Sequence, residues 1–165
     1  MRDTLPAELV ELANRIAPRL KQRGDTVAVA EGSAGGLISA ALLSVPGASA
    51  YYVGGVVVYT LSASRAWMAG AIEAPPGMRG ATEEFAAYLA RSAAVKLDTT
   101  WGIGEAGAAG PPNRYGDPAG HCWVAVAGPA GVDTRHVLTG SDDRERNMVA
   151  FAAVALGLLD EVLAR

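Results

Sequence analysis

Apolar and polar positions alternate along the first part of the chain with the period of a helix that buries one face. This pattern covers residues 6–23, and Gly24 follows at the place where glycine commonly ends a helix. The short apolar run 26–30 is typical of a buried strand. A glycine-rich turn at 31–36 and an apolar helical run at 37–44 come next. This order of helix, strand, turn and helix predicts an α/β fold.

The same reading predicts the remaining elements and one long loop. Glycine and proline crowd the segment 107–120, so we expect a loop there. Ordered loops of this length usually serve a function in compact domains. Further strands are predicted at 52–60, 100–104, 121–127 and 132–139, and further helices at 62–70, 82–96 and 141–163.

Composition narrows the class of protein. Half of the 165 residues are hydrophobic, which is enough for a sizeable core. The net charge of −3 argues against nucleic-acid binding, and the chain has no apolar run long enough for a membrane span. One cysteine and two histidines exclude an internal disulfide and favour a site without metal or other cofactor. We therefore expect a cytoplasmic protein.

The first candidate site is the turn at residues 31–36. Its glycines let the backbone approach a ligand, and free N–H groups at a helix start attract anions. We expect a phosphate near Gly35 and Gly36, with Glu31 and Ser33 beside it. The alternative is a tight turn that only brings strand and helix close together.

The second candidate pairs Ser49 with Tyr59. A serine nucleophile needs a base, and a tyrosine can relay or donate a proton. Arg65 cannot be that base because arginine stays protonated, so it is assigned with Thr60 to substrate binding. The alternative is that the Ser49 hydroxyl only caps a turn and that Tyr59 is a buried tyrosine of the strand.

The third candidate is the long loop together with the strand residue before it. Arg114 could hold a phosphate or carboxylate through two hydrogen bonds, and His121 can exchange a proton near neutral pH. Glu105 and Asn113 add polar groups beside them, and loops at the carboxyl ends of strands share one crevice. The alternative is a surface pair of Arg114 with Asp117 and a histidine that merely begins a strand.

Six short motifs, taken in order, resemble one known family. Each is weak alone, but their order and spacing are similar to the CinA C-terminal domain family, which includes nicotinamide mononucleotide deamidases. The resemblance covers nearly the whole chain. The motifs are Ala30–Gly36, Pro46–Tyr52, Gly55–Thr60, Gly107–Pro111, Asp117–Gly120 and Asp143–Arg144.

The resemblance implies a compact and usually oligomeric α/β/α domain with a metal-free activity. That activity is hydrolysis of the nicotinamide amide, which gives nicotinate mononucleotide and ammonia. The family's catalytic serine and tyrosine fall on Ser49 and Tyr59. Its catalytic lysine falls on Ser64, which removes the base.

Three family hydroxyls are missing as well, because they fall on Gly32, Ala34 and Ala106. Glu105 or His121 could supply a different base. Three readings stay open: a deamidase with a rebuilt site, a hydrolase of a related nucleotide or amide, and a catalytically silent nucleotide-binding or assembly module. Fold alone does not decide between them.

Together these observations predict a three-layer α/β/α sandwich with a mixed sheet, formed by one domain over residues 1–165. We expect an amidohydrolase-like protein for a nicotinamide nucleotide, with weak or absent turnover and a small-molecule nucleotide or amide as its ligand. The last predicted helix is apolar over much of its circumference, including Leu159, Val162 and Leu163. That face predicts a homo-oligomer, most simply a two-fold dimer.

Overall fold

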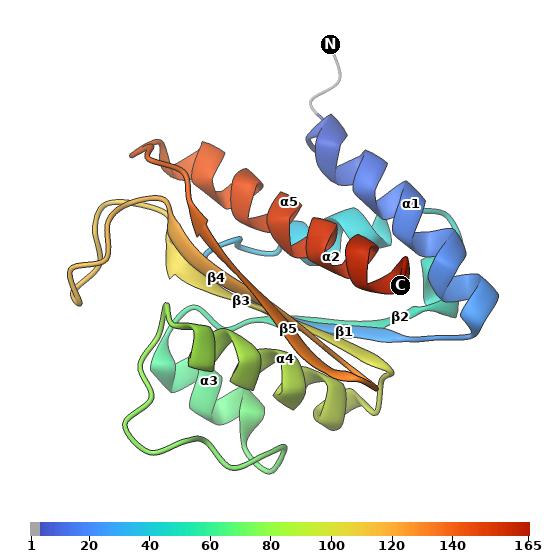
Figure 1. The fold of residues 1–165 in the computed structure, drawn as a ribbon, viewed down its shortest axis with the longest axis horizontal. Helices are drawn as coiled ribbons and strands as arrows, with labels where there is room; N and C mark the ends of the chain where they lie inside the picture. The colour runs from blue at the N-terminus through green and yellow to red at the C-terminus, as the bar shows by residue number, and fades with distance from the viewer. Residues whose placement is uncertain (1–3) are drawn as a thin grey trace.

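The chain folds into three layers, with one sheet between two layers of helices (Figure 1). The computed structural model describes residues 4–165. The helices are α1 (Ala7–Arg23), α2 (Leu37–Leu43), α3 (Leu61–Met68), α4 (Glu83–Leu97) and α5 (Arg144–Leu163), with a short 3-10 helix, η1, at Ala48–Ala50. The strands are β1 (Val27–Glu31), β2 (Tyr52–Val57), β3 (Trp101–Ala108), β4 (His121–Gly128) and β5 (Gly131–Leu138).

The sheet is mixed, as the sequence predicts, and its strand order is β2-β1-β3-β4-β5. β1 runs parallel to both β2 and β3, and the remaining pairs are antiparallel. The carboxyl ends of β1, β2 and β3 therefore meet at one edge of the sheet. Glu31 and Glu105 are partners in the parallel register at that edge.

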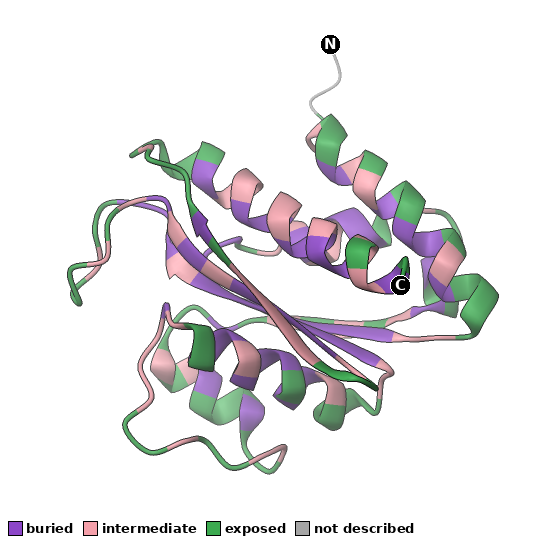
Figure 2. Cartoon of the chain, in the orientation of Figure 1, coloured by how far each residue is buried: buried purple, intermediate pink, exposed green. Residues whose placement is uncertain are grey.

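The two faces of the sheet pack differently. The face toward α1, α2 and α5 carries the larger core, with side chains such as Ile16, Leu156 and Phe151 fully buried (Figure 2). On the other face α4 lies very close to β3. A Cβ atom on Gly104 would stand 2.0 Å from the Ala86 carbonyl oxygen, so only glycine fits there. This close approach brings α4 to the edge where the candidate site lies.

The predicted elements are confirmed in type and order, but several boundaries differ: β2 ends at Val57 and not at residue 60, and α5 begins at Arg144 and not at residue 141. The largest difference is at the end of β3. β3 continues to Ala108, past its predicted end at residue 104, so the long loop is confined to 109–120. Glycines weaken the strand signal in this stretch, although close packing against α4 and β4 requires them. Side chains cap α4 and α5: the Thr82 hydroxyl accepts from the Phe85 N–H. Asp143 does the same for Arg146.

The last helix is covered by the chain's own core. Leu159 and Leu163 are buried within the single chain, and Val162 is half-buried. The apolar circumference of α5 thus gives no argument for a second subunit, and the homo-oligomer stays a prediction. Within residues 4–165, none of the helices is long and apolar enough to cross a membrane.

Candidate functional site

A cavity of about 430 Å³ opens where β1, β2 and β3 end, on the side of α3 and α4. Its floor is formed by lining residues at the carboxyl ends of these three strands and directly after them. Its outer wall comes from the segment before α4 and from the long loop. The lining residues are Gly32, Ser33, Val58, Tyr59, Thr60, Leu61, Gly80, Ala81, Phe85, Ala106, Gly107, Asn113, Arg114 and Tyr115.

Glu31 does not face this cavity; it caps α2. Its fully buried carboxylate accepts from the backbone N–H groups of Gly36 (2.7 Å), Ile38 (3.1 Å) and Ser39 (2.9 Å). The Ser39 hydroxyl donates to it as well, at 2.9 Å. Burial raises the pKa of Glu31, and these hydrogen bonds act in the opposite direction. Its oxygens thus accept from N–H groups at the start of α2 that have no partner within the helix.

This cap overturns the expectation of a phosphate at Gly35 and Gly36. The Gly36 N–H is taken by Glu31, and the Gly35 N–H donates to the Gly32 carbonyl. Neither glycine lines the cavity. Gly35 has a φ of +68°, and a Cβ there would meet the Met148 Cε atom at 2.7 Å. The alternative interpretation, a tight turn for close packing, is the one the structure supports.

Glu105 braces the same turn from β3. Its fully buried carboxylate accepts from the N–H groups of Gly32 (3.0 Å) and Ala34 (2.8 Å) and from the Ser33 hydroxyl. Burial is the main cause that raises the pKa of Glu105. The carboxylate does not line the cavity, so the structure gives no support to Glu105 as a base or a substrate contact. Ser33 does line it, although its hydroxyl is engaged with Glu105.

Cys122 completes this buried cluster. Its thiol donates to Glu105 at 3.3 Å, and burial raises the pKa of the thiol well above its ordinary value. The thiol therefore stays protonated, and the nucleophilic thiolate form is disfavoured. Across residues 4–165, no three His, Cys, Asp or Glu side chains gather in a way that could hold a metal ion.

Ser49 and Tyr59 lie at opposite ends of β2. Ser49 is exposed in η1, before the strand, while Tyr59 follows it and lines the cavity. The six residues of β2 alone separate them by roughly 17 Å. Within one chain the two side chains therefore cannot act on the same bond. Ser64, where the family's lysine falls, is buried in α3 at 3% exposure.

Tyr59 is held by an arginine that sequence reasoning treated as part of a helix start. Arg144 donates through Nη2 to the Tyr59 hydroxyl at 3.0 Å and through Nη1 to the Gly110 carbonyl. It thereby ties the long loop to the end of β2. Thr60 lines the cavity and caps α3, because its hydroxyl accepts from the Ala63 N–H. Arg65 is exposed on α3 and does not line the cavity.

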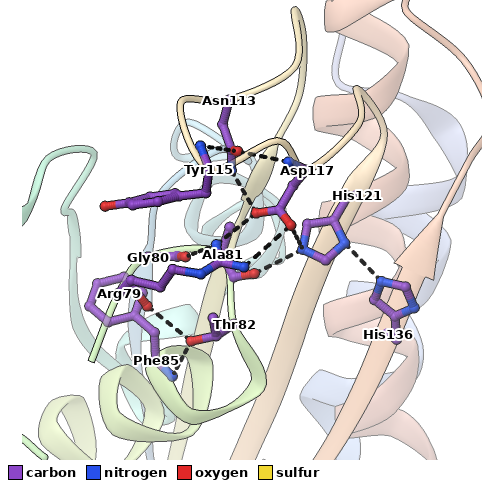
Figure 3. A network of polar contacts seen from close by, with 10 residues as sticks. All are labelled: Arg79, Gly80, Ala81, Thr82, Phe85, Asn113, Tyr115, Asp117, His121 and His136. Atoms are coloured by element: carbon purple, nitrogen blue, oxygen red, sulfur yellow. Dashed lines mark hydrogen bonds and ion pairs between the residues drawn. The ribbon is translucent and has the colours of Figure 1, made fainter. Parts of the chain in front are cut away.

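Of the predicted loop residues, Asn113 and Arg114 line the cavity and His121 does not. The His121 ring instead contacts the Ala81 carbonyl and His136 (Figure 3). The alternative Arg114–Asp117 pair is wrong: Asp117 pairs with Arg79, and the Arg114 guanidinium lies over the Tyr115 ring. The sequence gives no local signal for Arg79, because its partner Asp117 lies 38 residues further along the chain.

With this geometry in place, comparison with known proteins assigns the family. The sequence profile of the CinA C-terminal domain matches residues 9–163. The chain belongs to the CinA C-terminal domain family. A CinA-like protein of Anaeromyxobacter dehalogenans is 35% identical over 148 residues, which are 88% of this chain and 36% of that protein. A CinA-like protein of Frankia casuarinae is 38% identical over 139 residues, or 83% and 32%.

This CinA-family chain thus spans about a third of the length of these curated relatives. Solved structures match it over nearly their full length. The competence/damage inducible protein CihA of Agrobacterium tumefaciens has a TM-score of 0.87 and 28% identity, with 99% of this chain and 100% of that chain covered. A CinA superfamily protein of Klebsiella pneumoniae has a TM-score of 0.86 and 27% identity, with 94% and 98% covered.

In this CinA-family domain, two positions of the cavity floor have no hydroxyl. Gly32 and Ala106 line the cavity at two positions where the family pattern has hydroxyls. Ala34, the third such position, is fully buried and does not line it. At these two positions the floor of the cavity therefore offers no polar side-chain group.

Proposed function

We propose that this CinA-family domain binds a nicotinamide mononucleotide or a closely related nucleotide in the cavity, and that it hydrolyses the amide slowly at most. The proposal follows the family resemblance for the class of ligand. The residues that line the cavity are the reason why we expect binding with little turnover.

The observation that carries the proposal is the chemistry of the cavity lining. Arg114 is its one charged side chain, and no salt bridge engages this guanidinium in the described part of the chain. A free guanidinium beside tyrosine rings suits a ligand with an anionic group and a planar ring. A mononucleotide has both.

The same lining lacks the groups that hydrolysis of an amide needs. It contains no lysine, histidine, aspartate or glutamate to accept a proton near neutral pH. Its hydroxyls at Ser33 and Thr60 already bond within the protein, and Ser49 lies at the far end of β2. This favours the silent binding module over a working amidohydrolase.

The experiment measures ligand binding and ammonia release on the same purified protein. We expect nicotinamide mononucleotide to raise the melting temperature in proportion to the logarithm of its concentration, since a ligand stabilises the state that it binds. We expect little ammonia. Turnover on the order of 10 per second, as in ordinary metabolic enzymes, would contradict the proposal. So would the lack of any shift at millimolar ligand.

A further inference from the structure

The outer wall of the cavity is made of two segments that lie far apart in the sequence. Residues 78–82 precede α4, and residues 113–117 belong to the long loop, and Figure 3 shows their polar side chains turned toward each other. Gly80 and Ala81 from the first segment and the residues 113–115 from the second line the cavity. The relative position of the two segments therefore sets the shape of the wall.

Asp117 is the centre of the contacts between them. Its carboxylate accepts from both terminal nitrogens of Arg79, at 2.7 and 3.4 Å, and from the Asn113 amide at 2.8 Å. The hydrogen bond from Arg79 is the main cause that lowers the pKa of Asp117, so the acid is ionised at neutral pH. The Asp117 side chain is mostly shielded, which strengthens a paired contact compared with one in open water.

These contacts also fix the residues that reach the ligand space. The Asn113 side-chain oxygen accepts from the backbone N–H groups of Tyr115 and Asp117, both at 3.0 Å, and so closes the turn around Arg114. The Tyr115 ring lies near two guanidinium groups: Arg79 is 4.7 Å and Arg114 is 5.2 Å from the ring centre. A chain of contacts thus runs from Asp117 through Arg79 and Tyr115 to Arg114.

We call the contacts of Asp117 with Arg79 and Asn113 the clamp. Two histidines connect it to β4 and β5. His121 Nε2 is 2.8 Å from the Ala81 carbonyl, which can only accept, so this nitrogen carries a proton. The other nitrogen of a neutral His121 then accepts from His136 Nε2, at 2.8 Å. The rim of the wall before α4 is thereby bonded to the sheet as well as to the loop.

We infer that Asp117 is a positioning residue, which holds Arg114 at the cavity so that its guanidinium meets the anionic group of a bound nucleotide. This inference rests on the proposed function for its ligand. Asp117 does not line the cavity, and it acts through Arg79, Asn113 and Tyr115. When the clamp is loosened, binding must order the 113–117 segment, and that ordering opposes binding.

The test compares nicotinamide mononucleotide with nicotinamide riboside, which lacks the phosphate, by calorimetric titration. Asp117→Asn keeps the size of the side chain and removes its charge. We expect it to weaken mononucleotide binding roughly 3- to 10-fold, the range that ordering a long side chain implies, and to leave riboside binding within about twofold. Asp117→Glu should restore part of the loss.

A double-mutant cycle separates positioning from a general loss of structure. Arg114→Ala should weaken mononucleotide binding by itself, and adding Asp117→Asn should then cost little more, because the two act through one contact chain. Additive losses, or an equal loss for the riboside, would overturn the inference. Asp133→Asn is the matched control. Asp133 lies on β5, and the substitution removes its exposed ion pair with Arg165.

A measurement without ligand separates this inference from the proposed function. Hydrogen exchange at the amides of residues 113–117 should become faster in Asp117→Asn and stay unchanged in Asp133→Asn. Unchanged exchange at 113–117 overturns the clamp, whatever binds. If exchange changes as expected but the wild type binds no mononucleotide, the proposed function is wrong, and so is the role of Arg114 toward that ligand.

Discussion

Glu31 and Glu105 are neighbours on β1 and β3; the Glu105 carboxylate accepts from the segment that joins β1 to α2, and the Glu31 carboxylate accepts from the end of that segment and from the first turn of α2. Both are fully buried, and each of them accepts several hydrogen bonds. The nearby charge of Glu31 adds to burial in raising the pKa of Glu105. Both acids are candidate substrate contacts by sequence, yet they hold the backbone beside the cavity and do not line it.

Glu105→Gln should destabilise the fold by about 2–3 kcal/mol, because an amide NH₂ cannot accept and leaves a buried backbone N–H unpaired. The free energy of unfolding in urea measures the loss. Glu161→Gln is the control: it also removes a carboxylate, but from an exposed pair with Arg135, so its effect should stay below about 1 kcal/mol. Equal effects of the two substitutions would refute the bracing role of Glu105.

The same acids predict the sign of a pH effect. Because their folded-state pKa values are raised, their contribution to stability is fully present below the unfolded value near 4.5 and is lost as pH rises through the folded values. The pKa of Asp117 is lowered, so its contribution is present at neutral pH and is lost as pH falls through the folded value.

Urea unfolding of the wild type and of Glu105→Gln at several pH values between 4.5 and 8 checks this sign. The stability difference between them should shrink as pH rises, since the wild type loses the contribution that protonated Glu105 makes. A difference that grows with pH would mean that the pKa of Glu105 is lowered in the fold.

The sequence was sufficient for the elements because their signals are local. The apolar stripe of α1, the Thr82 cap and the turn between β4 and β5 are each contained in a few neighbouring residues. Glu31 is a local signal as well, since Gly36, the N-cap residue of α2, has no side chain that could cap the helix. An acid five residues earlier can fill that role only when the turn folds back, which the glycines allow.

The candidate site depends on contacts that no local pattern carries. Asp117 finds Arg79, 38 residues away, and Arg144 reaches Tyr59 over 85 residues. Ser49 was paired with Tyr59 by closeness in the sequence and by the family resemblance, yet an extended strand holds them apart. Proximity along a strand is therefore poor evidence for a shared site.

Two glycines should respond to alanine in opposite directions. Gly104→Ala forces a Cβ to within 2.0 Å of the Ala86 carbonyl oxygen, so α4 must move, and we expect a loss of at least about 2 kcal/mol. Gly157→Ala in α5 meets no atom within 4 Å, and a better helix former should add roughly 0.5–1 kcal/mol. Thermal unfolding of both variants decides whether close packing of α4 on β3 constrains this face.

The last prediction concerns hydrolysis of nicotinamide mononucleotide and the serine at position 64, where the family resemblance places a lysine. The wild type should release ammonia far more slowly than about 10 per second, because Ser64 stands where the family's base is expected. We expect that one residue is not enough, since the family resemblance also places hydroxyls at Gly32 and Ala106, and both positions line the cavity. The backbone at Gly32 leaves room for a Cβ atom, which would meet backbone oxygens only at 3.4 Å or more.

We therefore expect Ser64→Lys alone to change turnover little and the triple variant with Gly32→Ser and Ala106→Ser to raise it at least tenfold, a step of about 1.4 kcal/mol in activation free energy. Circular dichroism must first show that the triple variant folds, because position 64 is buried. A folded triple variant without any gain would show that more than these groups separates this domain from an active deamidase. Measurable wild-type turnover that Ser49→Ala abolishes would instead show that the site has been rebuilt around that serine.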